Sequence, residues 1–260
     1  MYIVFDIGGT NMRIAGVEDG VLGEVHKVLT PKNPDEGIST LVSIAKEIAG
    51  KKVIDAGGGD VAGSVAADGK IFDAKNLPQW EGIGIARELS ERFGAPVRVA
   101  NDCVVVGLGE LEHGAGKGFS DIVYITVSTG VGGAHVVSDD ILRSPVLADD
   151  VDQLKEKLEE QISGTAVQKK FGIEPKNLDS LDERNKLADI LAQGLKEIIE
   201  AWPCEAVILG GSMITGINPI PLERVSATLS SLMPNPPVIK MAELGDSGGL
   251  HGGMILAGLR

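Results

Sequence analysis

The segment Tyr2-Ile3-Val4-Phe5-Asp6-Ile7-Gly8-Gly9-Thr10-Asn11 decides the fold that this sequence predicts. An apolar run ends at an acid, and two glycines, a hydroxyl residue and an amide follow. Glycines let backbone N–H groups approach phosphate oxygens closely, and the hydroxyl of Thr10 adds a donor. The pattern is typical of a strand that ends in a phosphate-binding turn, with Asp6 placed to hold Mg²⁺ through water. The alternative is an ordinary hairpin turn capped by Asp6.

A second glycine-rich loop, Ser128-Thr129-Gly130-Val131-Gly132-Gly133, stands about a hundred residues further along the chain. It follows a β-rich run, as the first loop does, and it offers the same kinds of donor. Two such hairpins predict two lobes, each with a mixed sheet and helices packed outside it. The repeated pattern indicates that the two lobes arose by an internal duplication. The loops together are expected to bind a polyphosphate, and the residues assigned to the nucleotide are Asp6, Gly8, Gly9, Thr10, Asn11, Thr129, Gly130 and Gly132.

Hydrophobic periodicity and turn residues place the other elements. The expected strands cover residues 12–17, 21–29, 53–56, 97–100, 131–137, 207–209 and 237–241. The expected helices cover residues 38–48, 81–93, 107–112, 151–160, 164–171, 184–201 and 247–258. The predicted N-terminal lobe is 1–110 plus 246–260, and the predicted C-terminal lobe is 111–245.

Two further turns carry chemical groups. Asn101-Asp102 follows a predicted strand, and phosphoryl transfer to an alcohol needs a group that positions the hydroxyl and accepts its proton. Asp102 is the predicted base and Asn101 a hydroxyl ligand; the alternative role of Asp102 is a helix N-cap. Leu209-Gly210-Gly211-Ser212 leads from a strand into a helix, and such an N-terminus is suited to phosphate or adenosine. Gly210, Gly211 and Ser212 therefore join the predicted nucleotide residues.

Composition limits the possible partners. The chain has 260 residues and a net charge of -13, so nucleic acid and anionic membranes are unfavourable partners. No apolar run approaches the length of about 20 residues that spans a bilayer. Cys103 and Cys204 form neither a disulfide framework nor a zinc motif. These features predict a cytoplasmic enzyme or binding protein.

Taken together, the loops resemble the ROK family of bacterial sugar kinases, in order along almost the whole chain. Besides the two phosphate loops and Ala100-Asn101-Asp102, the similar segments are Val61-Ala62-Gly63-Ser64-Val65 with Asp68-Gly69, Asn76-Leu77-Pro78-Gln79-Trp80, and Ser163-Gly164-Thr165-Ala166. Ala62 stands where the family has proline. The resemblance implies an actin/hexokinase-like (ribonuclease H-like) α/β fold, with two lobes around a cleft. It also implies MgATP as donor, Asp102 as base, a homodimer, and sugar contacts from Gly63, Asn76, Asn101 and Asp102.

Two family features are missing from the sequence. A Glu-x-Gly-His segment that holds sugar hydroxyls is absent between Val137 and Leu158, where Ser144–Asp152 stands instead. The cysteine-rich zinc loop that follows it is also absent, so no structural zinc is expected. Losing a buried carboxylate–hydroxyl pair would cost about 1.5–3 kcal/mol per bond. Asp149 or Asp150 is a possible replacement; the favoured alternative places both acids on a solvated helix start.

The sequence predicts ATP-dependent phosphorylation of a hexose or hexose-like sugar, as in a glucokinase. Two alternatives remain. One is a non-catalytic sugar or nucleotide sensor on the same fold, which the missing segment favours and the presence of Asp102 opposes. The other is a kinase for a different small acceptor, because a fold does not fix a function. The sequence does not specify the sugar or the hydroxyl that is phosphorylated.

Overall fold

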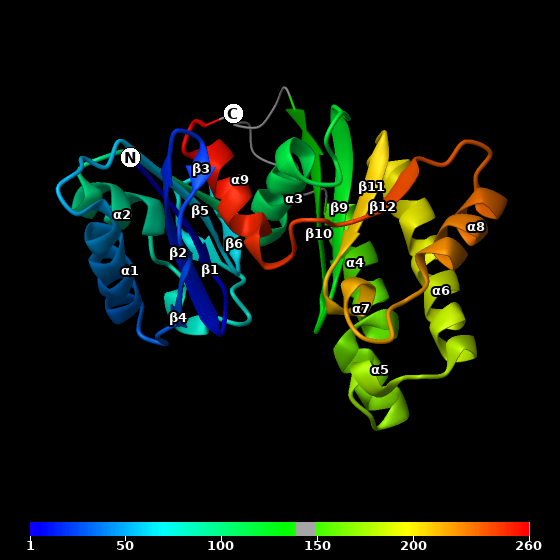
Figure 1. Cartoon of the computed structure of the whole chain (residues 1–260). Helices are drawn as coiled ribbons and strands as arrows, with labels where there is room; N and C mark the ends of the chain where they lie inside the picture. The colour runs from blue at the N-terminus through cyan, green and yellow to red at the C-terminus, as the bar shows by residue number, and fades with distance from the viewer. Residues whose placement is uncertain (139–148, 260) are drawn as a thin grey trace. The chain divides into compact units, whose positions relative to one another are not determined.

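The structure is a computed structural model that describes residues 1–138 and 149–259. Contacts divide the chain into two compact units, Met1–Gly109 with Asp246–Arg260, and Glu110–Gly245. Each unit is built on its own main sheet, and each is mixed α/β, as the sequence predicts. Figure 1 gives the element labels used below.

The main sheet of the first unit has the order β3-β2-β1-β5-β8, with β4 also paired to β2. Its strands are β1 (Tyr2–Ile7), β2 (Asn11–Glu18), β3 (Val21–Leu22), β4 (His26–Leu29), β5 (Ala56–Val61) and β8 (Val97–Asn101). β2 is antiparallel to β1, whereas β1, β5 and β8 are parallel. The carboxyl ends of these three parallel strands therefore meet at one edge of the sheet.

Helices cover both faces of this sheet (Figure 1). One core cluster joins Ile3, Phe5 and Ile7 of β1 to α1 (Pro34–Ala49) and α2 (Ile85–Phe93). A second cluster joins Val4 of β1 to α9 (Gly248–Leu256). Because side chains alternate along a strand, Asp6 shares the α9 face with Val4.

The three consecutive glycines of this unit, Gly57–Gly59, lie inside β5, although the predicted strand covers only residues 53–56. Val53 is 76% exposed. A Cβ at Gly58 would lie 2.1 Å from the carbonyl oxygen of Gly253 in α9, and one at Gly59 would lie 2.2 Å from that of Phe5. The prediction was wrong because these glycines permit close packing of a strand, and strand propensity does not reveal such contacts.

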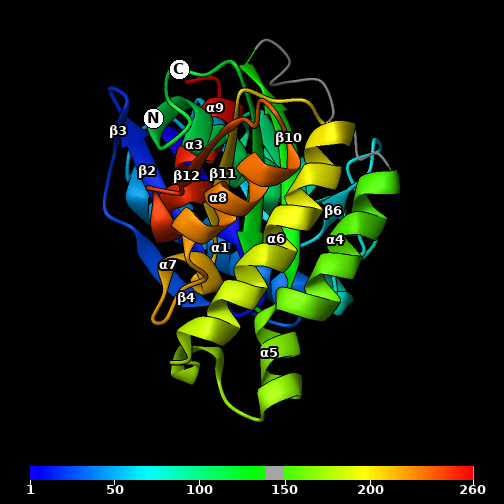
Figure 2. The ribbon, with the colours of Figure 1, turned by 90° about the vertical axis from the view of Figure 1, so that its right-hand side faces the viewer.

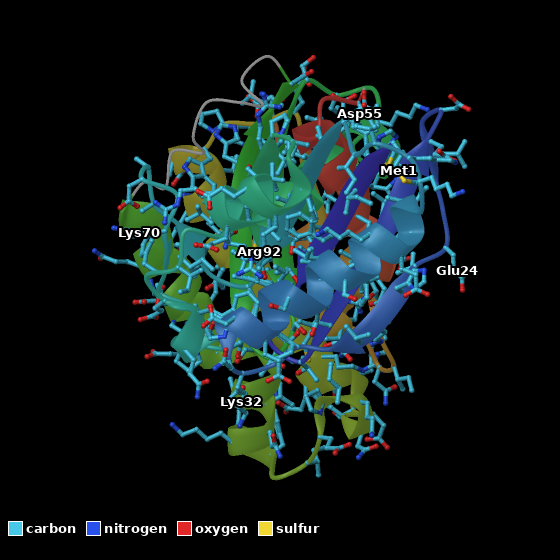
Figure 3. The ribbon with its side chains drawn as sticks, turned by 90° about the vertical axis from the view of Figure 1, so that its left-hand side faces the viewer. Met1, Glu24, Lys32, Asp55, Lys70 and Arg92 are labelled. Atoms are coloured by element: carbon cyan, nitrogen blue, oxygen red, sulfur yellow. The ribbon has the colours of Figure 1, made fainter. Side chains whose placement is uncertain are left out.

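Smaller elements connect the sheet to its helices. Residues 21–29 form β3 and β4 rather than one strand, because the Gly23 N–H bonds the Gly16 carbonyl between them. A small hairpin, β6 (Ser64–Val65) and β7 (Ile71–Phe72), precedes the 3₁₀ turn η1 (Pro78–Trp80). α3 (Asp102–His113) starts directly after β8 and continues into the second unit. In Figure 3, Met1 lies near Asp55, whose carboxylate pairs with the N-terminal ammonium group.

The second unit has a four-stranded sheet in the order β10-β9-β11-β12. These strands are β9 (Asp121–Val127), β10 (Val131–Val137), β11 (Ala206–Gly210) and β12 (Val238–Met241). The helices are α4 (Asp149–Ile162), α5 (Gly164–Phe171), α6 (Leu181–Ala201), α7 (Ser212–Thr215) and α8 (Leu222–Leu232), and the 3₁₀ turn η3 (Pro175–Asn177) lies between α5 and α6. A further 3₁₀ turn, η4 (Gly245–Ser247), stands where the chain passes from the second unit back to the first.

The core of the second unit lies between this sheet and its long helices. Apolar residues of α4, α6 and α8 form one buried cluster with Val123, Ile125 and Val207. Figure 2 shows the ribbons of these three helices. No helix is predicted from the sequence at α8. Among the helices of residues 1–138 and 149–259, none is long and apolar enough to cross a bilayer.

Candidate functional site

The predicted catalytic residues of the first unit gather where its parallel strands end. Asp6 stands one residue before the end of β1, and Asn101 is the last residue of β8. β5 lies between these strands, and its register pairs Asp60 with both Asp6 and Ala100. Asp102 follows as the first residue of α3. Ligands of open parallel sheets bind at this edge, so the topology brings acids from three segments to a candidate reaction centre.

Asp6 is held by an ion pair within its own hairpin. Its Oδ2 accepts a hydrogen bond from Arg13 Nη1 at 2.7 Å, and Arg13 Nη2 reaches Asp246 Oδ2 at 2.8 Å. Both members of the Asp6–Arg13 pair are largely buried, with 17% of each side chain exposed. The guanidinium fixes the orientation of the Asp6 carboxylate, because its fork of donors is rigid.

Asp60 is a buried acid that lies beside Asp6 on the neighbouring strand β5. It is 1% exposed, and within the described part of the chain neither of its oxygens meets an N–H or O–H donor. A Cβ at Gly249, near the start of α9, would lie 2.4 Å from Asp60 Oδ2 and 3.2 Å from Asp6 Cβ, so the helix closes tightly over the two acids. Burial and the negative charges of Asp6 and Asp102 raise the pKa of Asp60 well above its ordinary value. The burial of Asp60 and its acidic neighbours therefore favour the protonated form of this side chain.

This raised pKa predicts a pH-dependent stability that Asp60→Asn removes. The folded state keeps the proton of Asp60 above about pH 4, where the unfolded chain releases it. The contribution of Asp60 is therefore fully present below about pH 4 and is lost as pH rises toward the folded pKa. We expect the Tm of Asp60→Asn, relative to the unchanged protein, to increase between pH 5 and pH 8. Thermal unfolding at four pH values measures it.

Asp189→Asn is the matched control for that experiment. Hydrogen bonds from Arg224 and Thr228 lower the pKa of Asp189, so its contribution is present above about pH 4 and is lost as pH falls. Its Tm difference should not rise between pH 5 and pH 8. Equal pH profiles for the two variants would contradict the assignment of the proton to Asp60.

Asn101 and Asp102 form the turn between β8 and α3. Asn101 Nδ2 donates to the Gly63 carbonyl at 3.1 Å, and its Oδ1 accepts from the Cys103 N–H at 3.0 Å. The same N–H lies 2.9 Å from Asp102 Oδ1. Asn101 thus ties the predicted sugar residue Gly63 to the predicted base. Burial raises the pKa of Asp102, the hydrogen bond from the Cys103 backbone opposes that rise, and the charge of Asp6 adds to it.

The first glycine loop lies against the segment of the remaining predicted sugar residue, Asn76. A Cβ at Gly9 would come within 2.5 Å of Asn76 Cβ, so only glycine allows this approach. The Gly8 N–H donates to the Asn11 carbonyl at 3.0 Å, which closes the turn around Thr10. The predicted phosphate and sugar residues of the first unit therefore lie on connected segments. They are Gly8, Gly9, Thr10, Asn11, Gly63, Asn76, Asn101 and Asp102.

The second glycine loop is held by the start of α5 and the end of α4, both in its own unit. The Gly164 N–H, at the start of α5, donates to the Ser128 carbonyl at 2.7 Å, and Thr165 Oγ1 donates to the Thr129 carbonyl at 2.8 Å. Glu159 of α4 accepts from the Val131 N–H at 2.9 Å. A Cβ at Gly130 would lie 2.5 Å from that carboxylate.

The turn before α7 belongs to the same neighbourhood. Ser128 Oγ lies 3.2 Å from Ser212 Oγ. Gly211 has φ of 87°, and a Cβ there would lie 2.3 Å from the Val127 carbonyl. The structure thus brings Thr129, Gly130 and Gly132 together with Gly210, Gly211 and Ser212 at the carboxyl ends of β9 and β11.

The residues present fit the two groups that the sequence predicts. Glycines that leave backbone N–H groups close to a ligand, as at Gly9 and Gly211, suit phosphate oxygens. Oxygen ligands suit Mg²⁺, and an Asp6 carboxylate already paired with Arg13 suits contact through water. Within the described ranges no three His, Cys, Asp or Glu side chains are placed to bind a metal directly.

Several site residues are absent from the sequence-based prediction: Arg13, Asp60 and Glu159. Asp60 carries a weak signal, since an acid ends a glycine-rich strand as Asp6 ends the first. Arg13 and Glu159 carry none, because their partners lie on other elements. The proposed replacement acids, Asp149 and Asp150, begin α4, but their side chains and residues 139–148 lie outside the described residues.

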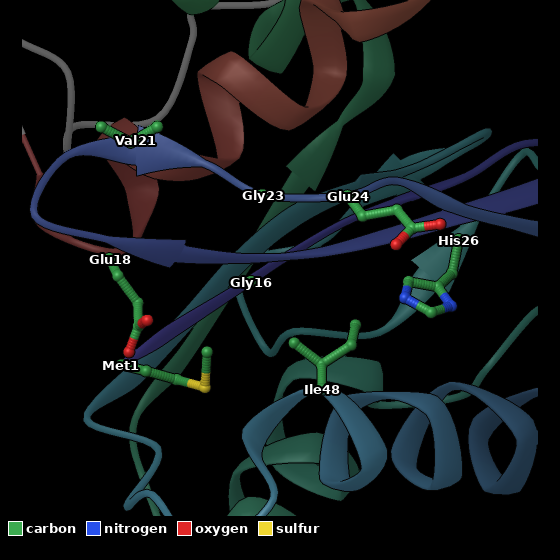
Figure 4. A pocket seen from close by; sticks show the side chains of 8 residues that line it. All are labelled: Met1, Gly16, Glu18, Val21, Gly23, Glu24, His26 and Ile48. Carbon is green, nitrogen blue, oxygen red and sulfur yellow. The ribbon is translucent and has the colours of Figure 1, made fainter.

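Other features of the two units stand apart from these loops. His135 pairs with Asp121 at 2.6 Å and stacks on Trp202, so it serves the sheet of the second unit. Burial and the charge of Asp121 raise the pKa of Cys204 to about 12, which makes it a poor nucleophile. A cavity of about 350 Å³ lies in the first unit between β2 and α1, with Met1, Glu18, His26 and Ile48 on its walls (Figure 4).

Comparison with known proteins gives a consistent result. The model of the ROK family matches residues 2–145, more than half of the chain. A glucokinase of Streptomyces coelicolor is 30% identical over 53% of this chain, and the match covers 44% of the glucokinase. A ROK hexokinase structure from Thermus thermophilus superimposes with a TM-score of 0.83, at 24% identity, covering 98% of this chain and 97% of that one. A ROK glucokinase of Streptomyces griseus, solved with glucose and AMPPNP, gives 0.77 at 22% identity, with 98% of each chain covered.

Proposed function

Because the chain belongs to the ROK family, we propose that it is an ATP-dependent kinase that phosphorylates a hexose or hexose-like sugar. The observation that carries this proposal is the position of Asp102. It starts α3 at the carboxyl ends of β1, β5 and β8, beside Asn101 and the Gly63 loop. A non-catalytic binding protein has no need of a base there.

In the proposed reaction, Asp102 accepts the proton of the attacking sugar hydroxyl. The hydroxyl oxygen bonds to the γ-phosphorus of ATP, the bond from that phosphorus to the β–γ bridging oxygen breaks, and ADP leaves. A raised pKa suits this role, because a base accepts a proton best when its pKa approaches the working pH. Gly63, Asn76 and Asn101 are the proposed sugar contacts. The glycine loops and Ser212 are proposed to bind the nucleotide through backbone N–H and hydroxyl donors. Asp6 would hold Mg²⁺ through water, and the ion would supply positive charge for the phosphates.

The sugar is the open part of the proposal. Relatives include glucokinases, an N-acetyl-D-glucosamine kinase and a structure described as a putative N-acetylmannosamine kinase. The missing Glu-x-Gly-His segment favours a substrate other than plain glucose, or a sensor that binds sugar without turnover. We also propose a homodimer that works in the cytoplasm, in line with the family resemblance and two unbridged cysteines.

A coupled ADP-release assay with MgATP tests the function. The panel is glucose, mannose, fructose, N-acetylglucosamine, N-acetylmannosamine and allose. We expect one or a few sugars to raise ADP release at least about tenfold above the rate without sugar. Nucleotide binding with no sugar-dependent release would reject the kinase in favour of the sensor or an untested acceptor.

A further inference from the structure

Thr30, which directly follows β4, holds the first glycine loop by two hydrogen bonds. Its hydroxyl donates to the Gly8 carbonyl at 2.6 Å, and its backbone N–H donates to the Thr10 carbonyl at 3.0 Å. These bonds turn two carbonyl groups of the loop toward Thr30. Thr30 therefore fixes a loop that is otherwise rich in glycine and conformationally free.

The direction of the Gly8 carbonyl determines the direction of a neighbouring donor. In a trans peptide the C=O of one residue and the N–H of the next point in opposite directions. When the Thr30 hydroxyl binds the Gly8 carbonyl, it aims the Gly9 N–H to the other side of the loop. In the described part of the chain that N–H finds no backbone acceptor. It is thus a donor left for a phosphate oxygen.

The next residue, Pro31, connects this arrangement to the segment that carries Asn76. Trp80 Nε1 donates to the Pro31 carbonyl at 3.1 Å. Trp80 is fully buried, and its ring packs so closely on α1 that a Cβ at Gly37 would lie 2.3 Å from it. Trp80 ends the segment Ala74–Trp80, whose Asn76 touches Gly9. Thr30 and Pro31 therefore lie between the loop and this segment, with a hydrogen bond to each.

We propose that Thr30 is a positioning residue for the nucleotide phosphates, and that Thr30–Pro31 couples phosphate binding to the sugar-binding segment Ala74–Trp80. The inference rests on the proposed function: its phosphate part needs nucleotide binding without turnover, and its coupling part also needs sugar binding. Neither Thr30 nor Trp80 is assigned a contact with substrate; both act on the geometry of residues that are.

Thr30→Val tests the first part, because valine keeps the shape and the backbone N–H but removes the hydroxyl. Losing one such bond is expected to weaken MgATP binding, measured by calorimetry, about three- to tenfold. Thr30→Ser should restore the affinity. Thr40→Val is the matched control: its hydroxyl donates to the Glu36 carbonyl within α1, so MgATP affinity should not change. Unchanged affinity in Thr30→Val would overturn the proposal.

Trp80→Phe tests the coupling, because it removes the N–H that reaches Pro31 at a distance from the phosphate loop. We expect it to raise the KM for ATP as well as the KM for the active sugar, by about three- to tenfold each. Trp202→Phe, a buried tryptophan of the second unit, controls for the loss of ring volume. In the double variant Thr30→Val/Trp80→Phe, the increase in the KM for ATP should be smaller than the product of the single effects.

The outcomes separate this inference from the proposed function. If the protein binds MgATP but turns over no sugar, the kinase proposal is rejected. Calorimetric titrations of Thr30→Val and Trp80→Phe with MgATP then still test the coupling. If the protein turns over sugar and both variants have unchanged KM values, the kinase proposal stands and the coupling is rejected. A drop in Tm without any change in KM or MgATP affinity would assign Thr30 and Trp80 a structural role and overturn the proposal.

Discussion

Replacing Asp102 with asparagine is expected to lower sugar-dependent ADP release by between about 10²- and 10⁴-fold. The substitution removes the proton acceptor but keeps the shape of the side chain. Asparagine retains an oxygen for the Cys103 N–H, which Asp102 Oδ1 accepts at 2.9 Å, so the start of α3 should fold normally. The coupled ADP-release assay, run on the sugar that the panel identifies, measures the loss.

Binding measurements separate catalysis from folding in this variant. MgATP affinity should stay within about threefold of the unchanged protein, and the melting temperature should not fall appreciably. Asp189→Asn is a suitable control, because this acid of α6 pairs with Arg224 and Thr228 of α8 and should retain full turnover. Retention of more than a tenth of the activity in Asp102→Asn would show that another group accepts the proton.

Replacing Glu110 with alanine is expected to lower the free energy of unfolding by about 3–5 kcal/mol. Glu110 is fully buried, and its carboxylate accepts from the backbone N–H groups of Ala115, Glu243 and Leu244. Each donor left without a partner costs about 1–3 kcal/mol, and the vacated space adds a cavity term. Thermal and urea unfolding, with Tm expected to fall by roughly 6–20 °C, measure the effect.

The position of Glu110 makes this loss informative about the fold. The residue begins the second unit, and Leu244 is the penultimate residue of that unit. The Glu110 carboxylate thus hydrogen-bonds the first residue of this unit to the backbone of Glu243 and Leu244 near its last residue. Glu110→Gln, which keeps one acceptor oxygen, should lose less stability than Glu110→Ala. Glu112→Ala, on the same helix, should lose less than about 1 kcal/mol, and a comparable loss there would contradict the role of the hydrogen bonds.

Elements with strong local signals agree with the sequence-based prediction. Residues 131–137 and 164–171 form a strand and a helix with the predicted bounds, since alternation and a Ser163 N-cap mark them. The helix over Leu222–Leu232 and the strand through Gly57–Gly59 do not. The residues of α8 pack against α6, and the glycines of β5 pack against α9. Such contacts between distant segments produce no local sequence pattern.

The sequence by itself determined the two glycine loops, the Asn101–Asp102 turn and the family, because turn chemistry is local and the spacing of motifs is read directly along a chain. Only the tertiary structure decided which acid lies beside Asp6, which hydroxyl orients the Gly8 carbonyl, and which carboxylate hydrogen-bonds the first and last segments of the second unit together. Asp60, Thr30 and Glu110 act across 54, 22 and up to 134 residues of sequence. Such partners are set by strand register and helix packing, which arise only when the whole unit has folded.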